Sequence, residues 1–284
     1  PMTDFSPTVF ADDFAFLEGP RWHDDSLWLS DMWSFKVHRI SAGGTVTDVI
    51  DVPQRPSGLG FMPDGTLLVV SMADRRVYRH VDGDLVLHAD LGATVKADVN
   101  DMVVDDQGRA YVGNFGYDIF AGADPQDAEL VLIEPDGSHR VVANEMMFPN
   151  GMVLTNGGDT LVVAETFGHR LTAFDRDGDG NLNNRRVFAD LGEMTPDGIC
   201  LDVEGGIWIS SFATGDFARV VDGGEITDQF SVADRAAVAC QIGGADNRTL
   251  FCLTYGGQIE DLGSGARLAR IETVTVKVPG ASSP

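Results

Sequence analysis

The sequence predicts an all-β fold, specifically a six-bladed β-propeller whose blades each contain four strands. The first observation is an apolar motif that recurs six times along the 284 residues. The second is its spacing, with successive gaps of 39, 43, 50, 47 and about 41 residues, close to the length of one propeller blade. The third is that no long helical pattern or low-complexity linker separates the copies. The copies are headed by Glu18, Ser57, Asn100, Asn150, Asp197 and, in a degenerate sixth copy, approximately Val238.

Each repeat has the same expected order of elements. Apolar entry strands are expected at residues 17–22, 56–61, 99–104, 148–154, 196–201 and 237–242. Turns rich in Asp, Asn and Gly follow at residues 23–26, 63–65, 106–108, 156–158, 204–206 and 245–247, because these residue types tolerate the positive φ of hairpin turns. Second strands are expected at residues 27–29, 67–70, 110–112, 161–163, 207–209 and 250–253. Alternating third strands follow them, as at residues 36–40 and 76–79.

The two ends of the chain are expected to close the ring. An unpaired terminal strand would invite aggregation, so a propeller needs its last blade to be completed. The last repeat ends with the strand-like runs 267–272 and 273–276, and residues 8–10 offer an outer strand for the same blade. We therefore expect N- and C-terminal strands in one blade, and one propeller domain spanning residues 1–284.

The composition limits the classes of partner. A net charge of −24 argues against binding to nucleic acid or to an anionic membrane surface. This charge suits a cation-binding protein, and it equally suits an ordinary acidic, soluble surface. The three cysteines lack metal-ligand or redox spacing and lie in apolar runs, which favours core packing. With no apolar run near 18 residues and no charged leader, we expect a soluble, cytoplasmic protein of unknown oligomeric state.

Four polar residues head the predicted entry strands and define a candidate metal site. The first strand of each blade lines the channel of a propeller, so the starts of these strands meet on one face. Glu18, Asn100, Asn150 and Asp197 would supply two carboxylates and two amide oxygens. This donor set suits one hard divalent cation, with Ca²⁺ favoured and Zn²⁺, Mn²⁺ or Mg²⁺ as alternatives. In the competing interpretation, these Asn-Gly and Asp-Gly pairs only shape turns.

The motifs around these positions resemble those of one enzyme family. The motifs are Leu17-Glu18-Gly19-Pro20, Asn100-Asp101, Pro149-Asn150-Gly151 and Pro196-Asp197-Gly198. They resemble the gluconolactonase / senescence-marker-protein / luciferin-regenerating-enzyme family, whose members are six-bladed propellers that use a divalent cation to hydrolyse lactones. The resemblance implies that Glu18, Asn150 and Asp197 are metal ligands. It also implies that Asn100 is either a ligand or a substrate contact.

The sequence departs from the sugar-lactonase pattern in ways that favour a less polar substrate. By the resemblance, sugar-lactone enzymes carry an Arg two positions before the Asn-Asp pair, where this chain has Asp98. A downstream acidic sugar contact is replaced by residues 113–117. The loops expected above the cation are rich in aromatic residues, which favours an apolar lactone, although about half of them are expected to pack in the core. These candidate substrate contacts are Trp33, Phe115, Tyr117, Phe148, Phe167, Phe212 and Tyr255.

Three functions are compatible with this pattern. The first is lactone hydrolysis, in which the cation polarises the carbonyl, Asp197 accepts the proton of the attacking water, and Asp101 orients the ligands or merely stabilises a turn. The second is hydrolysis of phosphotriesters or fluorophosphates at the same ion. The third is a non-enzymatic binding module in which the ion only stabilises the channel.

Overall fold

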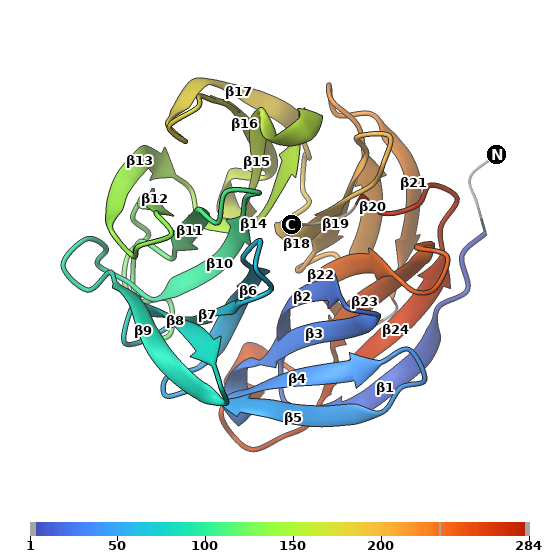
Figure 1. Cartoon of the computed structure of the whole chain (residues 1–284). Coiled ribbons are helices and arrows are strands. Elements are labelled where there is room, and N and C mark those ends of the chain that lie inside the picture. The colour runs from blue at the N-terminus through green and yellow to red at the C-terminus, as the bar shows by residue number, and fades with distance from the viewer. Residues whose placement is uncertain (1–3, 233, 282–284) are drawn as a thin grey trace.

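Six four-stranded antiparallel sheets form a ring in the computed structural model, which describes residues 4–232 and 234–281 (Figure 1). Blade 1 holds β2 (Leu17–His23), β3 (Ser26–Asp31), β4 (Lys36–Ser41) and β5 (Val46–Asp51). Blade 2 holds β6 (Pro56–Phe61), β7 (Leu67–Ser71), β8 (Arg76–Val81) and β9 (Asp84–Asp90). Blade 3 holds β10 (Val99–Val104), β11 (Ala110–Asn114), β12 (Ala128–Ile133) and β13 (His139–Met146).

The remaining blades repeat this order. Blade 4 holds β14 (Pro149–Thr155), β15 (Thr160–Glu165), β16 (Arg170–Arg176) and β17 (Leu182–Asp190). Blade 5 holds β18 (Pro196–Leu201), β19 (Ile207–Ser211), β20 (Asp216–Val220) and β21 (Ile226–Ser231). Blade 6 holds β22 (Ala236–Gly243), β23 (Thr249–Tyr255), β24 (Ala269–Thr275) and β1 (Thr8–Phe14). Short 3-10 turns lie at η1 (Met32–Ser34), η2 (Asn156–Gly158), η3 (Thr166–Gly168) and η4 (Ile259–Asp261).

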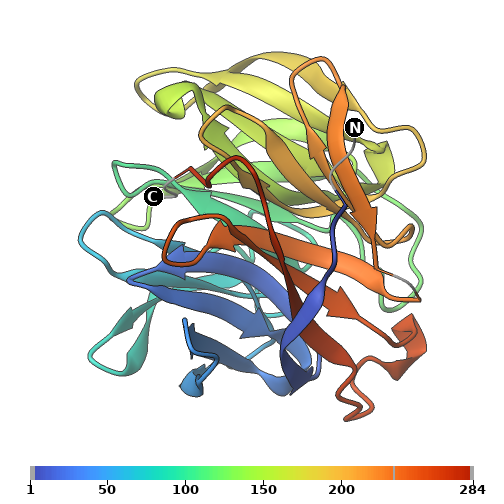
Figure 2. The same ribbon diagram turned by 90° about the vertical axis from the view of Figure 1, so that its right-hand side faces the viewer.

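The predicted fold and its closure are confirmed. The six predicted entry strands are the innermost strands β2, β6, β10, β14, β18 and β22. In blade 6, β1 from the N-terminal region pairs with β24 in register Thr8 to Thr273 and Phe14 to Ala269 (Figure 2). The two runs predicted at the end of the last repeat form the one strand β24. Residues 1–3 and 282–284 lie outside the described ranges, so the single domain over residues 1–284 stays a prediction.

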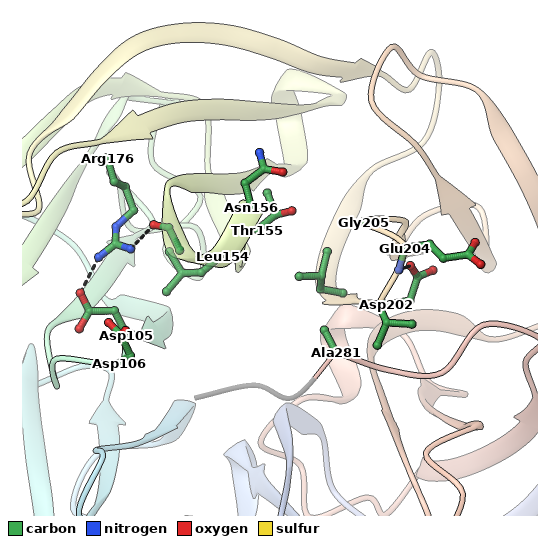
Figure 3. A pocket seen from close by; sticks show the side chains of 14 residues that line it. Asp105, Asp106, Leu154, Thr155, Asn156, Arg176, Asp202, Glu204, Gly205 and Ala281 are labelled. Atoms are coloured by element: carbon green, nitrogen blue, oxygen red, sulfur yellow. Dashed lines mark hydrogen bonds and ion pairs between the residues drawn. The ribbon is translucent and has the colours of Figure 1, made fainter.

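The C-terminal segment, described up to Ala281, lies at one mouth of the channel, where the innermost strands end. The N–H of Ala281 donates to the carbonyl of Leu201 at 3.0 Å, and the N–H of Gly280 donates to the carbonyl of Asn247 at 2.9 Å. A cavity of about 620 Å³ at this mouth is lined by Asp202 and by Asp105, whose carboxylate is held by Arg176 (Figure 3). The sequence-predicted site residues head the opposite ends of these strands, so this mouth is not the candidate site.

Glycines let the innermost strands of adjacent blades approach closely. A Cβ added to Gly151 would lie 2.6 Å from the nitrogen of Ile199 and 2.8 Å from the carbonyl oxygen of Asp197. A Cβ added to Gly198 would lie 2.4 Å from the Cβ of Ala239. These distances are shorter than van der Waals contact, so only glycine fits directly after Asn150 and Asp197. The glycines of the motifs therefore fix how near the heads of adjacent innermost strands lie.

We expect Gly151→Ala to destabilise the protein by about 1–3 kcal/mol, the usual cost of overpacking a tight core. Urea denaturation measures this loss. Gly178→Ala is the matched control, because a Cβ at Gly178 meets no atom within 4 Å in the described structure. This control should change stability by less than about 0.5 kcal/mol. Equal stability of Gly151→Ala and the control would contradict the steric argument.

Candidate functional site

The four predicted metal-binding side chains lie together. Glu18, Asn100, Asn150 and Asp197 are at most 6% exposed. They come from β2, β10, β14 and β18, which are the innermost strands of four different blades. All four line one cavity of about 400 Å³, a volume within the range of small-molecule pockets.

Two carboxylates face each other at this point. Burial raises the pKa of Glu18 well above its usual value, and the nearby carboxylates of Asp197 and Asp101 raise it further. Burial likewise raises the pKa of Asp197, with the charge of Asp101 as the next cause, and the neighbouring Glu18 and Asn150 side chains only partly offset this rise. Two neighbouring carboxylates that are buried repel each other strongly when both are charged, and a cation bound by both would remove the repulsion.

The unpaired oxygens at the site fit a hard divalent cation. The amide oxygen of Asn150 and one carboxylate oxygen of Asp197 are buried and have no hydrogen-bond partner among the described residues. Buried polar atoms normally have partners, so such orphaned oxygens need an explanation. Carboxylate and amide oxygens are the ligands of Ca²⁺ and related ions. No three His, Cys, Asp or Glu side chains cluster as metal ligands within residues 4–232 and 234–281, and the candidate set instead takes half of its donors from Asn.

Asn100 belongs to a hydrogen-bond network with the neighbouring blades. Its side-chain nitrogen donates to the carbonyl of Pro149 at 3.3 Å, so its amide oxygen points the other way. That oxygen accepts a hydrogen bond of 3.2 Å from the hydroxyl of Ser57. Ser57 heads the second repeat and is fully buried. Sequence reasoning assigned Ser57 no catalytic role, because it lies in no nucleophile motif.

Asp101 lies outside the cavity lining and contacts Arg21. Its carboxylate accepts a hydrogen bond of 3.0 Å from Nη2 of Arg21 and one of 2.8 Å from the N–H of Met102. Arg21 also donates to the carbonyl oxygens of Pro20 and Met102. Asp101 therefore has no substrate contact in this arrangement. The negative charge of Asp101 still affects the site, because it raises the pKa values of Glu18 and Asp197.

Four of the seven predicted aromatic contacts line the cavity, and three lie elsewhere. Trp33 packs edge-on against Phe120 with ring centroids 5.6 Å apart, and it lies under the guanidinium of Arg55. Tyr255 is only 2% exposed and packs edge-on against Phe16. Tyr117 is placed behind Phe148, with ring centroids 6.0 Å apart. The aromatic residues that do line the cavity as predicted are Phe115, Phe148, Phe167 and Phe212.

Two loops supply apolar lining residues that the sequence reasoning missed. Ile119 and Phe120 come from the loop between β11 and β12, and Ile259 and Leu262 come from the loop between β23 and β24. Large apolar residues in otherwise polar loops were the available signal. Phe16, Met32 and Ala213 also line the cavity. Apart from the four candidate ligands, the only polar lining residues in the described chain are Thr166 and Thr195.

The last residue of the second strand fixes the loop before the innermost strand in several blades. In blade 1 the carboxylate of Asp31 accepts a hydrogen bond of 2.9 Å from the N–H of Phe16. In blade 4 the carboxylate of Glu165 accepts one of 2.8 Å from the N–H of Met147. In blade 5 the hydroxyl of Ser211 accepts one of 3.0 Å from the N–H of Thr195. These side chains hold the segments that lead to Glu18, Asn150 and Asp197.

Glu165 is the most strongly bound of these groups. Its side chain is fully buried, and it pairs with Arg170 at 2.8 Å and also accepts from the hydroxyl of Thr172. Burial alone would raise the pKa of Glu165, but the hydrogen bonds from Arg170, Met147 and Thr172 outweigh it and hold the pKa below its usual value. The charged form of Glu165 therefore stabilises the fold above the pKa it has in the unfolded chain, and this contribution is lost as the pH falls through the lower, folded-state pKa.

We expect Glu165→Gln to lower the free energy of unfolding by about 2–4 kcal/mol at pH 7, because Arg170 loses its buried partner. Urea denaturation at several pH values checks this. The difference from wild type should shrink as the pH falls through the lowered pKa of Glu165 in the folded protein, because wild-type Glu165 itself then becomes protonated. Asp222→Asn, which removes an exposed pair with Arg186, should cost less than about 1 kcal/mol. A Glu165→Gln loss that is independent of pH would contradict the ion-pair account.

The chain is similar in sequence to known proteins over most of its length. Residues 16–256 match the model of the SMP-30/Gluconolactonase/LRE-like region. Pentonolactonase XacC of Haloferax volcanii is 29% identical over 249 residues, which cover 84% of this chain and 81% of that protein. Regucalcin of Danio rerio is 26% identical, with 82% of this chain and 81% of that protein covered.

Solved structures share the fold. A luciferin-regenerating enzyme superposes with a TM-score of 0.84 at 18% identity, covering 98% of both chains. XC5397 of Xanthomonas campestris, described as a gluconolactonase, superposes with a TM-score of 0.78 at 24% identity, covering 98% of this chain and 91% of that one. Within the described residues, no helix has the length and apolar character that a membrane crossing requires. With its family model matched over residues 16–256, the chain belongs to the SMP-30/gluconolactonase/LRE-like family.

Proposed function

We propose that this protein is a divalent-cation-dependent hydrolase that opens the ring of lactones less polar than gluconolactone. The observation that carries the proposal is the set of four oxygen donors in one apolar cavity: Glu18, Asn100, Asn150 and Asp197. Relatives named pentonolactonase and 6-deoxy-6-sulfogluconolactonase support the reaction class. The name regucalcin and the calcium-binding description of a structural neighbour support a divalent cation.

The four donors would hold the cation, and the chain supplies the rest of the site. When bound, the cation would polarise the lactone carbonyl and make a water more acidic. Asp197 is the acceptor for the proton of the attacking water in this proposal, because it is a carboxylate that lines the cavity next to the cation position. The Glu18 carboxylate, which lines the same cavity, would be a further ligand of the cation. The aromatic wall excludes bulk water, which strengthens every charge interaction inside the cavity.

The lining residues disfavour a sugar. The hydroxyl of Thr166 accepts from Asn150 and donates to the carbonyl of Pro196. The hydroxyl of Thr195 accepts a hydrogen bond of 2.8 Å from the N–H of Ala213. Apart from the candidate ligands, the described lining therefore offers little to bind the several hydroxyls of a sugar lactone. Each hydroxyl left without a partner would cost about 1–3 kcal/mol.

The position at which the sugar-lactone pattern has an Arg offers no unpaired cationic side chain in this chain. Asp98 stands where that pattern has Arg, and its carboxylate is paired with Arg55 at 2.5 Å. The guanidinium of Arg55 stacks on Trp33 and Phe120, at 4.8 and 5.0 Å from the ring centroids. Neither Arg55 nor Asp98 is among the described residues that line the cavity. Phe120 lines the cavity in front of this pair, so the wall presented to a substrate is apolar.

We expect chelator treatment to abolish hydrolysis of an alkyl-substituted δ-lactone, and single additions of Ca²⁺, Zn²⁺, Mn²⁺ or Mg²⁺ to identify the ion that restores it. Acid release at constant pH measures turnover. Asp197→Asn should lower kcat by at least about 100-fold, the usual contribution of a general base. Asp177→Asn, in an exposed hairpin turn, is the matched control and should keep wild-type kcat.

The same assay tests substrate polarity with an aryl lactone, gluconolactone and a phosphotriester alongside the alkyl lactone. The apolar wall predicts that kcat/KM for the alkyl or aryl lactone exceeds that for gluconolactone at least about tenfold, since a few unpaired hydroxyls suffice for this factor. Faster opening of gluconolactone would overturn the substrate class. Turnover of the phosphotriester alone would favour the second reaction, and turnover that ignores chelation would overturn the metal-dependent mechanism.

A further inference from the structure

Thr166 contacts two of the blades that carry candidate ligands. It follows β15 in blade 4 as the first residue of η3, and it is 6% exposed. Its hydroxyl oxygen lies 3.2 Å from the side-chain nitrogen of Asn150 and 2.7 Å from the carbonyl oxygen of Pro196. Asn150 is in the same blade, and Pro196 directly precedes Asp197 in the next blade.

The chemistry of these three groups leaves one arrangement of hydrogens. The carbonyl of Pro196 can only accept, so the single proton of the Thr166 hydroxyl is given to it. The hydroxyl oxygen can then only accept from Asn150, which requires the NH₂ end of the amide to face Thr166. If the amide were turned over, its oxygen would face the oxygen of Thr166, and no hydrogen would lie between these two acceptors. The amide oxygen of Asn150 is thereby directed away from Thr166.

We propose that Thr166 is a positioning residue that holds the amide oxygen of Asn150 toward the cation. This inference rests on the proposed function, because it assigns a partner to one of the candidate ligands. The Asn150 oxygen is buried and has no hydrogen-bond partner among the described residues, as expected of an oxygen kept for a ligand. Thr166 lines the cavity, but its proton is already used, so positioning rather than substrate contact is its role.

Asn100 is held by the same kind of link. Its NH₂ group donates to the carbonyl of Pro149, which directly precedes Asn150. In both cases the carbonyl of a proline lies just before the candidate ligand of the following blade. Pro149 accepts a hydrogen bond from the Asn100 amide itself, and Pro196 accepts one from Thr166, which in turn orients the Asn150 amide. The links run from Asn100 through Pro149 to blade 4, and from Asn150 through Thr166 and Pro196 to blade 5. The orientation of the two amides is thus coupled to the spacing of three blades.

The test is cation affinity, measured by calorimetric titration of the chelator-treated full-length protein with CaCl₂. Thr166→Val keeps the shape of the side chain and removes the hydroxyl. We expect it to raise Kd by about 10–100-fold, the usual effect of losing a group that orients a metal ligand. Thr166→Ser keeps the hydroxyl and should bind within about threefold of wild type.

Thr160→Val is the matched control. Thr160 accepts a hydrogen bond of 3.1 Å from the side-chain nitrogen of Asn156, an Asn–Thr pair of the same kind at the opposite end of β15. This variant should bind Ca²⁺ with wild-type Kd. Wild-type affinity in Thr166→Val, or equally weak binding in Thr166→Ser and Thr166→Val, would overturn the inference and leave the proposed cation site standing. Failure of wild type to bind would overturn both.

Discussion

Two carboxyl groups from the first and fifth blades are buried in one cavity of this ring, and the rest of the candidate site depends on their proximity. Glu18 and Asp197 are buried and line the same cavity, and the carboxylate of Asp101 raises the pKa of both. In an apolar setting such a pair is stable only if it shares a proton or binds a cation. The guanidinium of Arg21 is paired with Asp101 rather than with either of these carboxyl groups. A divalent cation would relieve the repulsion, and it would supply the chemistry of the proposed function.

The fold holds this unfavourable pair in place through contacts between blades. Glycines after the candidate ligands allow adjacent innermost strands to touch. The ends of the second strands then fix the preceding loops, through groups as different as the carboxylate of Glu165 and the hydroxyl of Ser211. Because these contacts are hydrogen bonds to backbone atoms, they fix the backbone that leads to the candidate ligands Glu18, Asn150 and Asp197. The contacts between the blades and within the loops therefore offset the free-energy cost of burying two like charges.

The sequence repeat made the fold and the candidate ligands at the strand starts predictable. It could not predict the cavity wall or the hydrogen bonds that orient the ligands. Repeat spacing gives the start of every innermost strand, so Glu18 and Asp197 were found although they lie far apart in the chain. The wall depends on loops outside the repeat, whose length and path differ from blade to blade. Phe120 was therefore missed, and Trp33 was expected in the wall although it packs behind Phe120. Thr166 was missed because its role depends on where a single proton goes, which requires coordinates.

The central claim is that a divalent cation binds on the axis between Glu18 and Asp197. Crystals grown with Mn²⁺ and measured near the manganese absorption edge test this most directly. The account predicts one strong anomalous peak in contact with carboxylate oxygens of Glu18 and Asp197 and with the amide oxygen of Asn150. Manganese peaks only elsewhere on this acidic protein, with none between Glu18 and Asp197, would contradict the account.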